Sequence, residues 1–229
     1  QGPYGTRAKA IELSKTEWYY QLDGDDILPG NAVQLVIDGI RENPLIEFVY
    51  GNCLYFDETK SFLRKPFDDD EVLCFKTQFC GTSPIKKSLF KKVGGFAPNL
   101  YNNADWDFWI SVNEIGAKGH KLDKPLYKRR IRFGNVGTVY VHTKPKNLEI
   151  IIKRHPKYFS VGNRKNIARF SLYEKLARYY KSLGNRKNAA KYAREALKYG
   201  DSIPAFNAIF KEEKMSSFRY ILRRLGRFV

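Results

Sequence analysis

The residues that decide the fold are 18–26, Trp-Tyr-Tyr-Gln-Leu-Asp-Gly-Asp-Asp, in which an aromatic run ends in three carboxylates. The run predicts a short buried strand over residues 18–22, and Gly24 lets the backbone turn sharply after it. Carboxylates at this spacing repel one another unless positive charge lies nearby. A cation such as Mg²⁺ or Mn²⁺, held together with a phosphate, meets that need, and ligands usually bind where strands of an open α/β sheet end.

The acidic turn has other interpretations. A solvated turn without any ligand is fully compatible with these residues and stays open at this point. A calcium loop of the EF-hand type is excluded, because the twelfth position counted from Asp23 is Gln34 rather than Glu. An aspartyl nucleophile of the phosphatase type is also excluded, because it needs Asp-x-Asp-Gly-Thr, whereas Ile27 follows the carboxylates here.

The composition and charge point to two regions of different chemistry. Hydrophobic residues make up 43% of the 229 residues and aromatic residues 15%, which is typical of a globular protein. Residues 151–229 hold 20 of the 41 Lys and Arg but only 5 of the 24 Asp and Glu, so most of the net charge of +17 lies there. A basic balance suggests nucleic acid as a partner, but no RRM, helix-turn-helix or zinc signature is present, and we expect no nucleic-acid binding.

The cysteines bear on the compartment of the protein. Cys53, Cys74 and Cys80 are odd in number and show no Cys-x-x-Cys spacing, so neither a disulfide framework nor a zinc site is expected. A reducing, cytoplasmic location fits this best.

The order of predicted elements is α/β followed by all-α. Helices are expected at 7–14, 32–40, 88–93 and 105–115, and strands at 18–22, 48–50, 53–56, 125–127 and 136–141. Residues 51–52, Gly-Asn, are expected to separate two of the strands, and residues 68–71 to form an acidic loop or helix start. From residue 147 onward the pattern is helical, so the predicted domains are 1–146 and 147–229.

Four stretches, in the same order along the chain, resemble family 2 glycosyltransferases. Residues 7–14, Arg-Ala-Lys-Ala-Ile-Glu-Leu-Ser, lead into the acidic turn as in that family's D-x-D region, and residues 86–96 look like the stretch before its acceptor site. Residues 104–109, Ala-Asp-Trp-Asp-Phe-Trp, and residues 126–135 resemble the two stretches that follow. The resemblance implies an inverting enzyme of GT-A fold, with a mixed sheet and helices, that uses nucleotide sugars.

The resemblance also implies roles for particular residues. Asp25 would coordinate a metal that bridges the donor diphosphate, and Asp23 would lie close to the ribose or the metal. Arg7 would contact the nucleotide, and Asp105 would be the general base that faces the acceptor. Without the resemblance, a helix N-cap is the preferred interpretation of Asp105. Arg132 stands where many relatives have His, and an arginine there can bind the diphosphate directly.

Two features depart from the family pattern. Ala104 replaces an acidic residue, so the usual acidic pair is reduced to Asp105 with Asp107 nearby. The first strand and nucleotide-binding elements of the family do not precede this chain, so we expect an N-terminally truncated catalytic domain, inactive or weak by itself. His120, His142 and His155 are isolated in the sequence and are interpreted as core or surface residues rather than ligands.

The helical region resembles one tetratricopeptide helix pair over residues 176–185 and 189–197. Residues 218–229, Phe-Arg-Tyr-Ile-Leu-Arg-Arg-Leu-Gly-Arg-Phe-Val, fit either a docked helix or an interfacial helix on anionic lipid at the inner membrane face. The function expected from the whole sequence is metal-assisted sugar transfer from a nucleotide sugar, with a UDP-sugar favoured, to a polysaccharide, lipid-linked or protein acceptor. The alternatives are a non-catalytic scaffold built on the helix pair and, with less support, a nucleic-acid-binding protein.

Overall fold

The structure is a computed structural model that describes residues 2–57, 61–64, 82–131 and 140–200. Its contacts divide the chain into two units, 1–140 and 141–229, whereas the sequence predicts a boundary after residue 146. Several expectations fall outside the described residues, namely those on 68–71, Cys74, Cys80, Arg132, most of 136–141, and 218–229.

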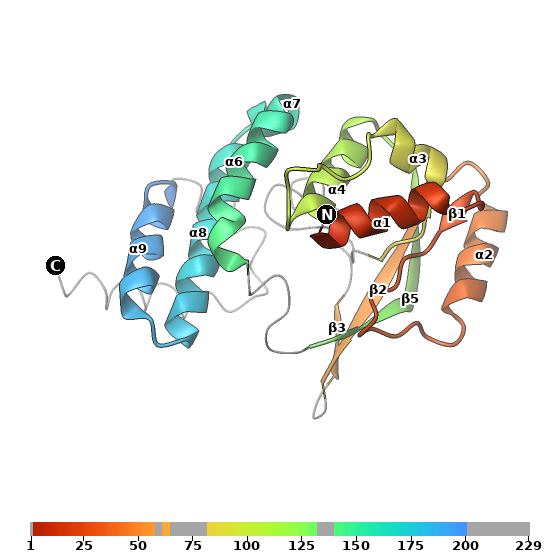
Figure 1. Cartoon of the computed structure of the whole chain (residues 1–229), viewed down its shortest axis with the longest axis horizontal. Coiled ribbons are helices and arrows are strands. Elements are labelled where there is room, and N and C mark those ends of the chain that lie inside the picture. The colour runs from red at the N-terminus through yellow and green to blue at the C-terminus, as the bar shows by residue number, and fades with distance from the viewer. Residues whose placement is uncertain (1, 58–60, 65–81, 132–139, 201–229) are drawn as a thin grey trace. The chain divides into compact units, whose positions relative to one another are not determined.

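A mixed five-stranded sheet organises the first unit (Figure 1). Its strands are β1 (Trp18–Tyr19), β2 (Phe48–Phe56), β3 (Ser61–Arg64), β4 (Ile85–Lys86) and β5 (Gly119–Arg130). The order is β1-β4-β2-β3, and β5 also pairs with β2. β2 is antiparallel to β3 and β4 and parallel to β5. This confirms a mixed α/β unit and makes β2 its central strand.

The expectation of two separate strands around residues 51–52 is wrong, because β2 runs through them. Its pairing with β5 shifts register on both sides of Asn52. A Cβ built on Gly51 would lie 2.8 Å from the carbonyl oxygen of Leu122, so only glycine fits there. The glycine therefore marks a close approach inside the strand rather than its end. The strand expected over 18–22 is also shorter, since β1 ends at Tyr19.

The helices of the first unit lie close to their predicted positions, apart from the start of one. They are α1 (Gly2–Leu13), α2 (Ala32–Glu42), α3 (Lys87–Lys92) and α4 (Ala104–Glu114). Glycines with positive φ, Gly94 and Gly116, follow α3 and α4 as the sequence indicates. α1 begins five residues before the expected position of 7, because Pro3 is compatible with a first helical turn and the apolar pattern does not reveal it.

Aromatic side chains form much of the core of this unit. Phe108 on α4 is 1% exposed and contacts the rings of Phe90 and Phe96. Trp109, 3% exposed, packs against Phe48 of β2, which confirms its interpretation as a core residue. A second cluster between α2 and the sheet contains Val36, Ile46, Val49 and Leu126. Both clusters fix helices against the sheet and so fix the loops that join them.

The second unit is helical over its described residues. It contains a short 3₁₀ turn (Val141–Thr143), α6 (Lys144–Arg154), α7 (Pro156–Ser160), α8 (Arg164–Ser182) and α9 (Arg186–Leu197). α8 and α9 lie side by side (Figure 1), with Gly184 at positive φ in the turn and three buried alanines of α9 at the seam, Ala189, Ala193 and Ala196. The helical hairpin is confirmed, and its likeness to a tetratricopeptide pair stays a prediction. No helix among the described residues is long and apolar enough to cross a membrane.

One ion pair joins α6 to α8 and makes the stability of this unit depend on pH. Arg169 donates to both carboxylate oxygens of Glu149, at 2.8 and 2.7 Å, and this bonding lowers the pKa of Glu149. Arg169→Met should lower the free energy of unfolding by about 0.5–1 kcal/mol at pH 7, a modest amount because solvent screens the half-exposed pair. Because the pKa is lowered on folding, the difference should be complete above the usual glutamate pKa and should vanish as pH falls through the lowered value.

Urea unfolding followed by circular dichroism between pH 7 and pH 3 measures this difference. The matched control is Arg194→Met, which removes the same charge from an exposed position on α9. A penalty for Arg169→Met that does not change with pH would show that packing rather than the ion pair is responsible.

Candidate functional site

The first helix is held at its C-terminal end by a lysine from another helix. Lys87, the first residue of α3, donates from Nζ to the backbone oxygen of Glu12 at 2.9 Å and to that of Ser14. Its backbone N–H also donates to the oxygen of Glu17 at 2.7 Å. A cation at the C-terminus of a helix satisfies carbonyl groups that have no partner within the helix and interacts favourably with the helix dipole. α1 is therefore fixed where it leads into β1.

Nearer its N-terminus, α1 contacts two of the residues singled out in the sequence. The hydroxyl of Tyr4 donates to Oδ1 of Asp105 at 2.8 Å, and Nη2 of Arg7 donates to Oδ1 of Asp23 at 2.5 Å. The guanidinium of Arg7 lies 5.1 Å from the centre of the Tyr4 ring. The structure thus connects Arg7, Asp23 and Asp105, which are far apart in sequence, through one helix.

Tyr4 is not among the site residues predicted from the sequence. Tyr4 and Arg7 are three residues apart and share one face of a helix, so the pair would have been visible had α1 been expected to begin at Gly2. Burial, together with the charge of Asp105 and the hydrogen bond to it, raises the pKa of Tyr4. The phenol therefore stays protonated and remains a donor. Burial works against the charge of Arg7, but the carboxylate of Asp23 outweighs it and raises the pKa of the guanidinium.

Asp105 lies in the first turn of α4 but is not its N-cap. The N-cap is Asn103, at φ 66°, and Asp105 is the second helical residue. Its Oδ1 accepts a hydrogen bond from the backbone N–H of Trp106 at 3.0 Å, and the start of a helix favours negative charge. Asp107 is 0% exposed and so does not present its carboxylate to solvent, while Ala104, which is also buried, has no carboxylate. Asp105 is the half-buried acidic residue at this end of α4.

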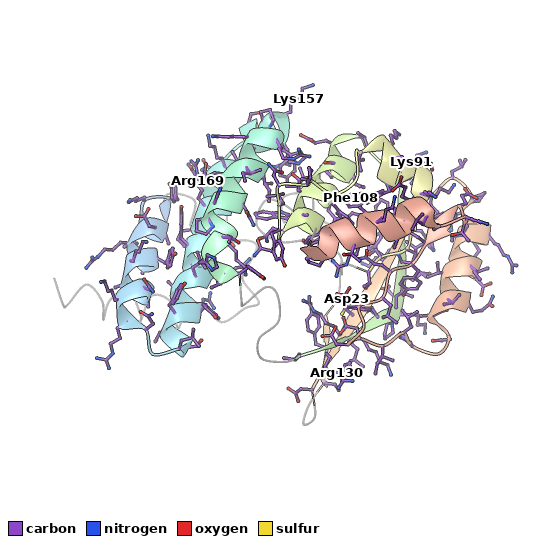
Figure 2. All side chains as sticks on the ribbon, viewed as in Figure 1. Asp23, Lys91, Phe108, Arg130, Lys157 and Arg169 are labelled. Atoms are coloured by element: carbon purple, nitrogen blue, oxygen red, sulfur yellow. The ribbon has the colours of Figure 1, made fainter. Side chains whose placement is uncertain are left out.

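The acidic turn is fastened to the end of β5. The carboxylate of Asp26 accepts hydrogen bonds from the hydroxyl of Tyr127 and, at 2.7 Å, from the backbone N–H of Arg130. Nε of Arg130 donates to the backbone oxygen of Asp25 at 3.1 Å. Burial and the bond to Asp26 raise the pKa of Tyr127, so its hydroxyl also stays a donor. Figure 2 shows Asp23 and Arg130 toward the same end of the sheet.

These contacts divide the three carboxylates by role. Asp26 is occupied in holding the turn, while Asp23 pairs with Arg7. Among the described residues, no group of three or more Asp, Glu, His or Cys is arranged to hold a metal ion. The turn therefore offers at most a two-carboxylate site, from Asp23 and Asp25, which suits Mg²⁺ or Mn²⁺ only if phosphate oxygens complete the coordination.

The three histidines lie on elements other than this turn. His120 on β5 lies beside Asn43 at the end of α2, and His155 is buried between α6 and α7. His142 belongs to the 3₁₀ turn of the second unit. Arg132, the proposed diphosphate ligand, lies outside the described residues.

The bond between Asp26 and β5 can be tested by an isosteric change. Asp26→Asn puts an amide NH₂ beside donors that need an acceptor, so we expect a loss of about 1–3 kcal/mol in the free energy of unfolding. Chemical denaturation followed by tryptophan fluorescence measures the loss. Asp123→Asn makes the same change at an exposed position of β5 and should be close to neutral. Equal stability of the two variants would contradict a structural role for Asp26.

Comparisons with known proteins relate the chain to sugar-transferring enzymes. It is 28% identical over 135 residues to an uncharacterized glycosyltransferase of Haemophilus influenzae, covering 55% of this chain and 46% of that protein. It is 22% identical over 161 residues to a chondroitin synthase of Pasteurella multocida, covering 67% of this chain and 16% of that protein. The chain is similar to glycosyltransferases. It spans about half the length of the first relative and a much smaller part of the second.

Comparisons with family models and with solved structures do not identify the family of the chain. No model of a protein family matches the chain. Crystal structures of S. aureus TarS align with TM-scores of 0.48 and 0.47 at 12% and 14% identity. They cover 88% and 78% of this chain, and 72% and 31% of the TarS chains.

Proposed function

We propose that the chain is part of a glycosyltransferase that moves a sugar from a nucleotide sugar, with a UDP-sugar favoured, to a polysaccharide, lipid-linked or protein acceptor. The observation that carries the proposal is the link through α1 between Asp105 and the acidic turn, in a chain similar to a glycosyltransferase. Sugar transfer needs a base for the acceptor and a charged site for the leaving diphosphate, and the residues proposed for these two roles both contact this helix.

The proposed reaction is a single in-line displacement with inversion. Asp105 takes the proton of the acceptor hydroxyl while the acceptor oxygen forms a bond to the anomeric carbon. The bond from that carbon to the diphosphate oxygen breaks, and its electron pair leaves with the nucleoside diphosphate. Arg7 and Arg132 are proposed to bind the nucleotide and the diphosphate, because guanidinium groups pair well with phosphate oxygens.

A divalent cation, Mg²⁺ or Mn²⁺, is part of the proposal. Asp25 and Asp23 would hold it, with the diphosphate as the remaining ligand, and when bound it would neutralise the charge that develops on the leaving group. The two-carboxylate donor set fits such a shared site better than a site made by protein alone. In the structure, the salt bridge with Arg7 orients the Asp23 carboxylate toward α1.

The basic helical unit is proposed to act outside the chemistry. Its excess of lysine and arginine would keep the enzyme near anionic lipid at the cytoplasmic face of the membrane, or near an acidic acceptor. No basic residue of that unit is proposed to take part in the chemical step.

The assignment of the base is tested with Asp105→Asn in the full-length protein. We expect kcat to fall at least about 100-fold, because a general base contributes about that much, while the affinity for UDP is retained. Turnover with a panel of nucleotide sugars and UDP binding by calorimetry give the two quantities. Asp123→Asn is the control. Turnover at the wild-type rate in Asp105→Asn would show that another group takes the proton.

The shared metal site is tested by combining metal and nucleotide. UDP should raise the unfolding temperature of the full-length protein only when Mg²⁺ or Mn²⁺ is present, since a ligand stabilises the folded state it binds. Asp25→Asn should abolish this shift, and Asp38→Asn, an acidic-to-amide change on α2, should preserve it. A full shift by UDP in the presence of a chelator would rule out the metal.

A further inference from the structure

We propose that Tyr4 is a positioning residue that sets the orientation of the Asp105 carboxylate, so that one of its oxygens is left for the acceptor proton. The proposal rests on the proposed function, because it assigns Tyr4 a part in the action of the base. It adds a residue that is in none of the matched sequence stretches, since those begin at Arg7.

The hydrogen bonds around Asp105 are asymmetric. Tyr4 donates to Oδ1 at 2.8 Å and the N–H of Trp106 donates to the same oxygen at 3.0 Å. Within the part of the chain that the structure describes, no hydrogen bond ends on Oδ2. Two donors on one oxygen fix the plane of the carboxylate, and Oδ2 is then the oxygen that takes up a proton.

The ring of Tyr4 is itself held on two sides. Its centre lies 5.2 Å from that of Phe96, and Phe96 in turn contacts Phe108 of α4 with a centre distance of 5.4 Å. The guanidinium of Arg7 lies near the ring as well. Because Phe108 and Asp105 belong to the same helix, ring and carboxylate are supported by one rigid element (Figure 2 labels Phe108 on α4). A carboxylate held in this way needs little reorganisation before reaction.

The positioning of the base and the binding of the sugar donor involve two different side chains of α1. Arg7 reaches Asp23 at the acidic turn, whereas Tyr4 reaches only toward the base. Loss of the Tyr4 hydroxyl should therefore change the rate of the chemical step and leave the donor site intact. Loss of the Arg7 side chain should affect both, because Arg7 contacts the Tyr4 ring as well as Asp23.

Kinetics of Tyr4→Phe in the full-length protein test the proposal. We expect kcat to fall about tenfold with KM for the nucleotide sugar unchanged, since a slightly misplaced catalytic group costs rate rather than substrate binding. Tyr4→Phe should cause no further loss in an Asp105→Ala background, because residues that act as one unit are not additive. Wild-type kcat in Tyr4→Phe, or a second tenfold loss in the double variant, would overturn the proposal.

A matched control comes from a second half-buried tyrosine. The hydroxyl of Tyr19 is buried and has no hydrogen-bond partner among the described residues, so Tyr19→Phe removes the same atom without removing a bond. Its kcat should equal that of the wild type. An equal loss in Tyr19→Phe would mean that the fall in Tyr4→Phe reflects packing, and this too would overturn the positioning role.

A stability cycle separates the contact from the function. Urea unfolding of wild type, Tyr4→Phe, Asp105→Ala and the double variant should give a coupling between the two positions, because neighbours that share a bond are not additive. Additive effects would show that the hydrogen bond is not formed. If no nucleotide sugar is turned over by the wild type, the proposed function fails and the role of Tyr4 with it, while the coupling still reports whether the bond exists.

Discussion

The engagement of Asp26 by the end of β5 is the interaction on which the arrangement of the site depends. Three carboxylates at one turn would repel one another, and the chain resolves this by giving each a different surrounding. Asp26 accepts from Tyr127 and Arg130 and so becomes part of the sheet. β5 pairs with β2, the central strand of the sheet. The hydrogen bonds of Asp26 to β5 therefore fix the acidic turn to the central part of the sheet.

Helix α1 connects the acidic turn with Asp105, the other part of the candidate site. Lys87 fixes its C-terminal end, Arg7 reaches back to Asp23, and Tyr4 reaches Asp105 on α4. The helix has almost no buried apolar side, since Ile11 is its one buried residue. Polar contacts therefore hold it more than packing does, and these contacts depend on geometry in a way that apolar packing does not. Each of the two carboxylates is thus tied to α1 by its own polar contact.

The sequence predicted the elements whose signals are local. The apolar side of α4 and the glycine after it placed that helix within a residue or two, and the carboxylates after the aromatic run identified the turn. The sequence did not predict features that depend on a residue far away along the chain. Gly51 looks like a break until the carbonyl of Leu122 is seen beside it, and the start of α1 has no apolar pattern because its N-terminal residues make polar contacts. For the same reason the contacts of Tyr127 and Arg130 with the acidic turn could not be found from spacing alone.

The charged residues of the chain also differ in role, since some form individual ion pairs and others contribute to the overall charge. All three acidic residues between positions 141 and 200, Glu149, Glu174 and Glu195, pair with basic neighbours, Arg169, Arg178 and Lys198. Between positions 141 and 200 the other Lys and Arg outnumber these acidic residues, and their excess charge acts as a collective field. In the first unit, by contrast, Arg7, Lys87 and Arg130 each have a defined acceptor. The net charge of +17 therefore says little about the candidate site, where cations are few and individually placed. Screening limits the reach of the surface field to about 8 Å at physiological salt, so it can concentrate an anionic surface or acceptor nearby but cannot substitute for the contacts at the acidic turn.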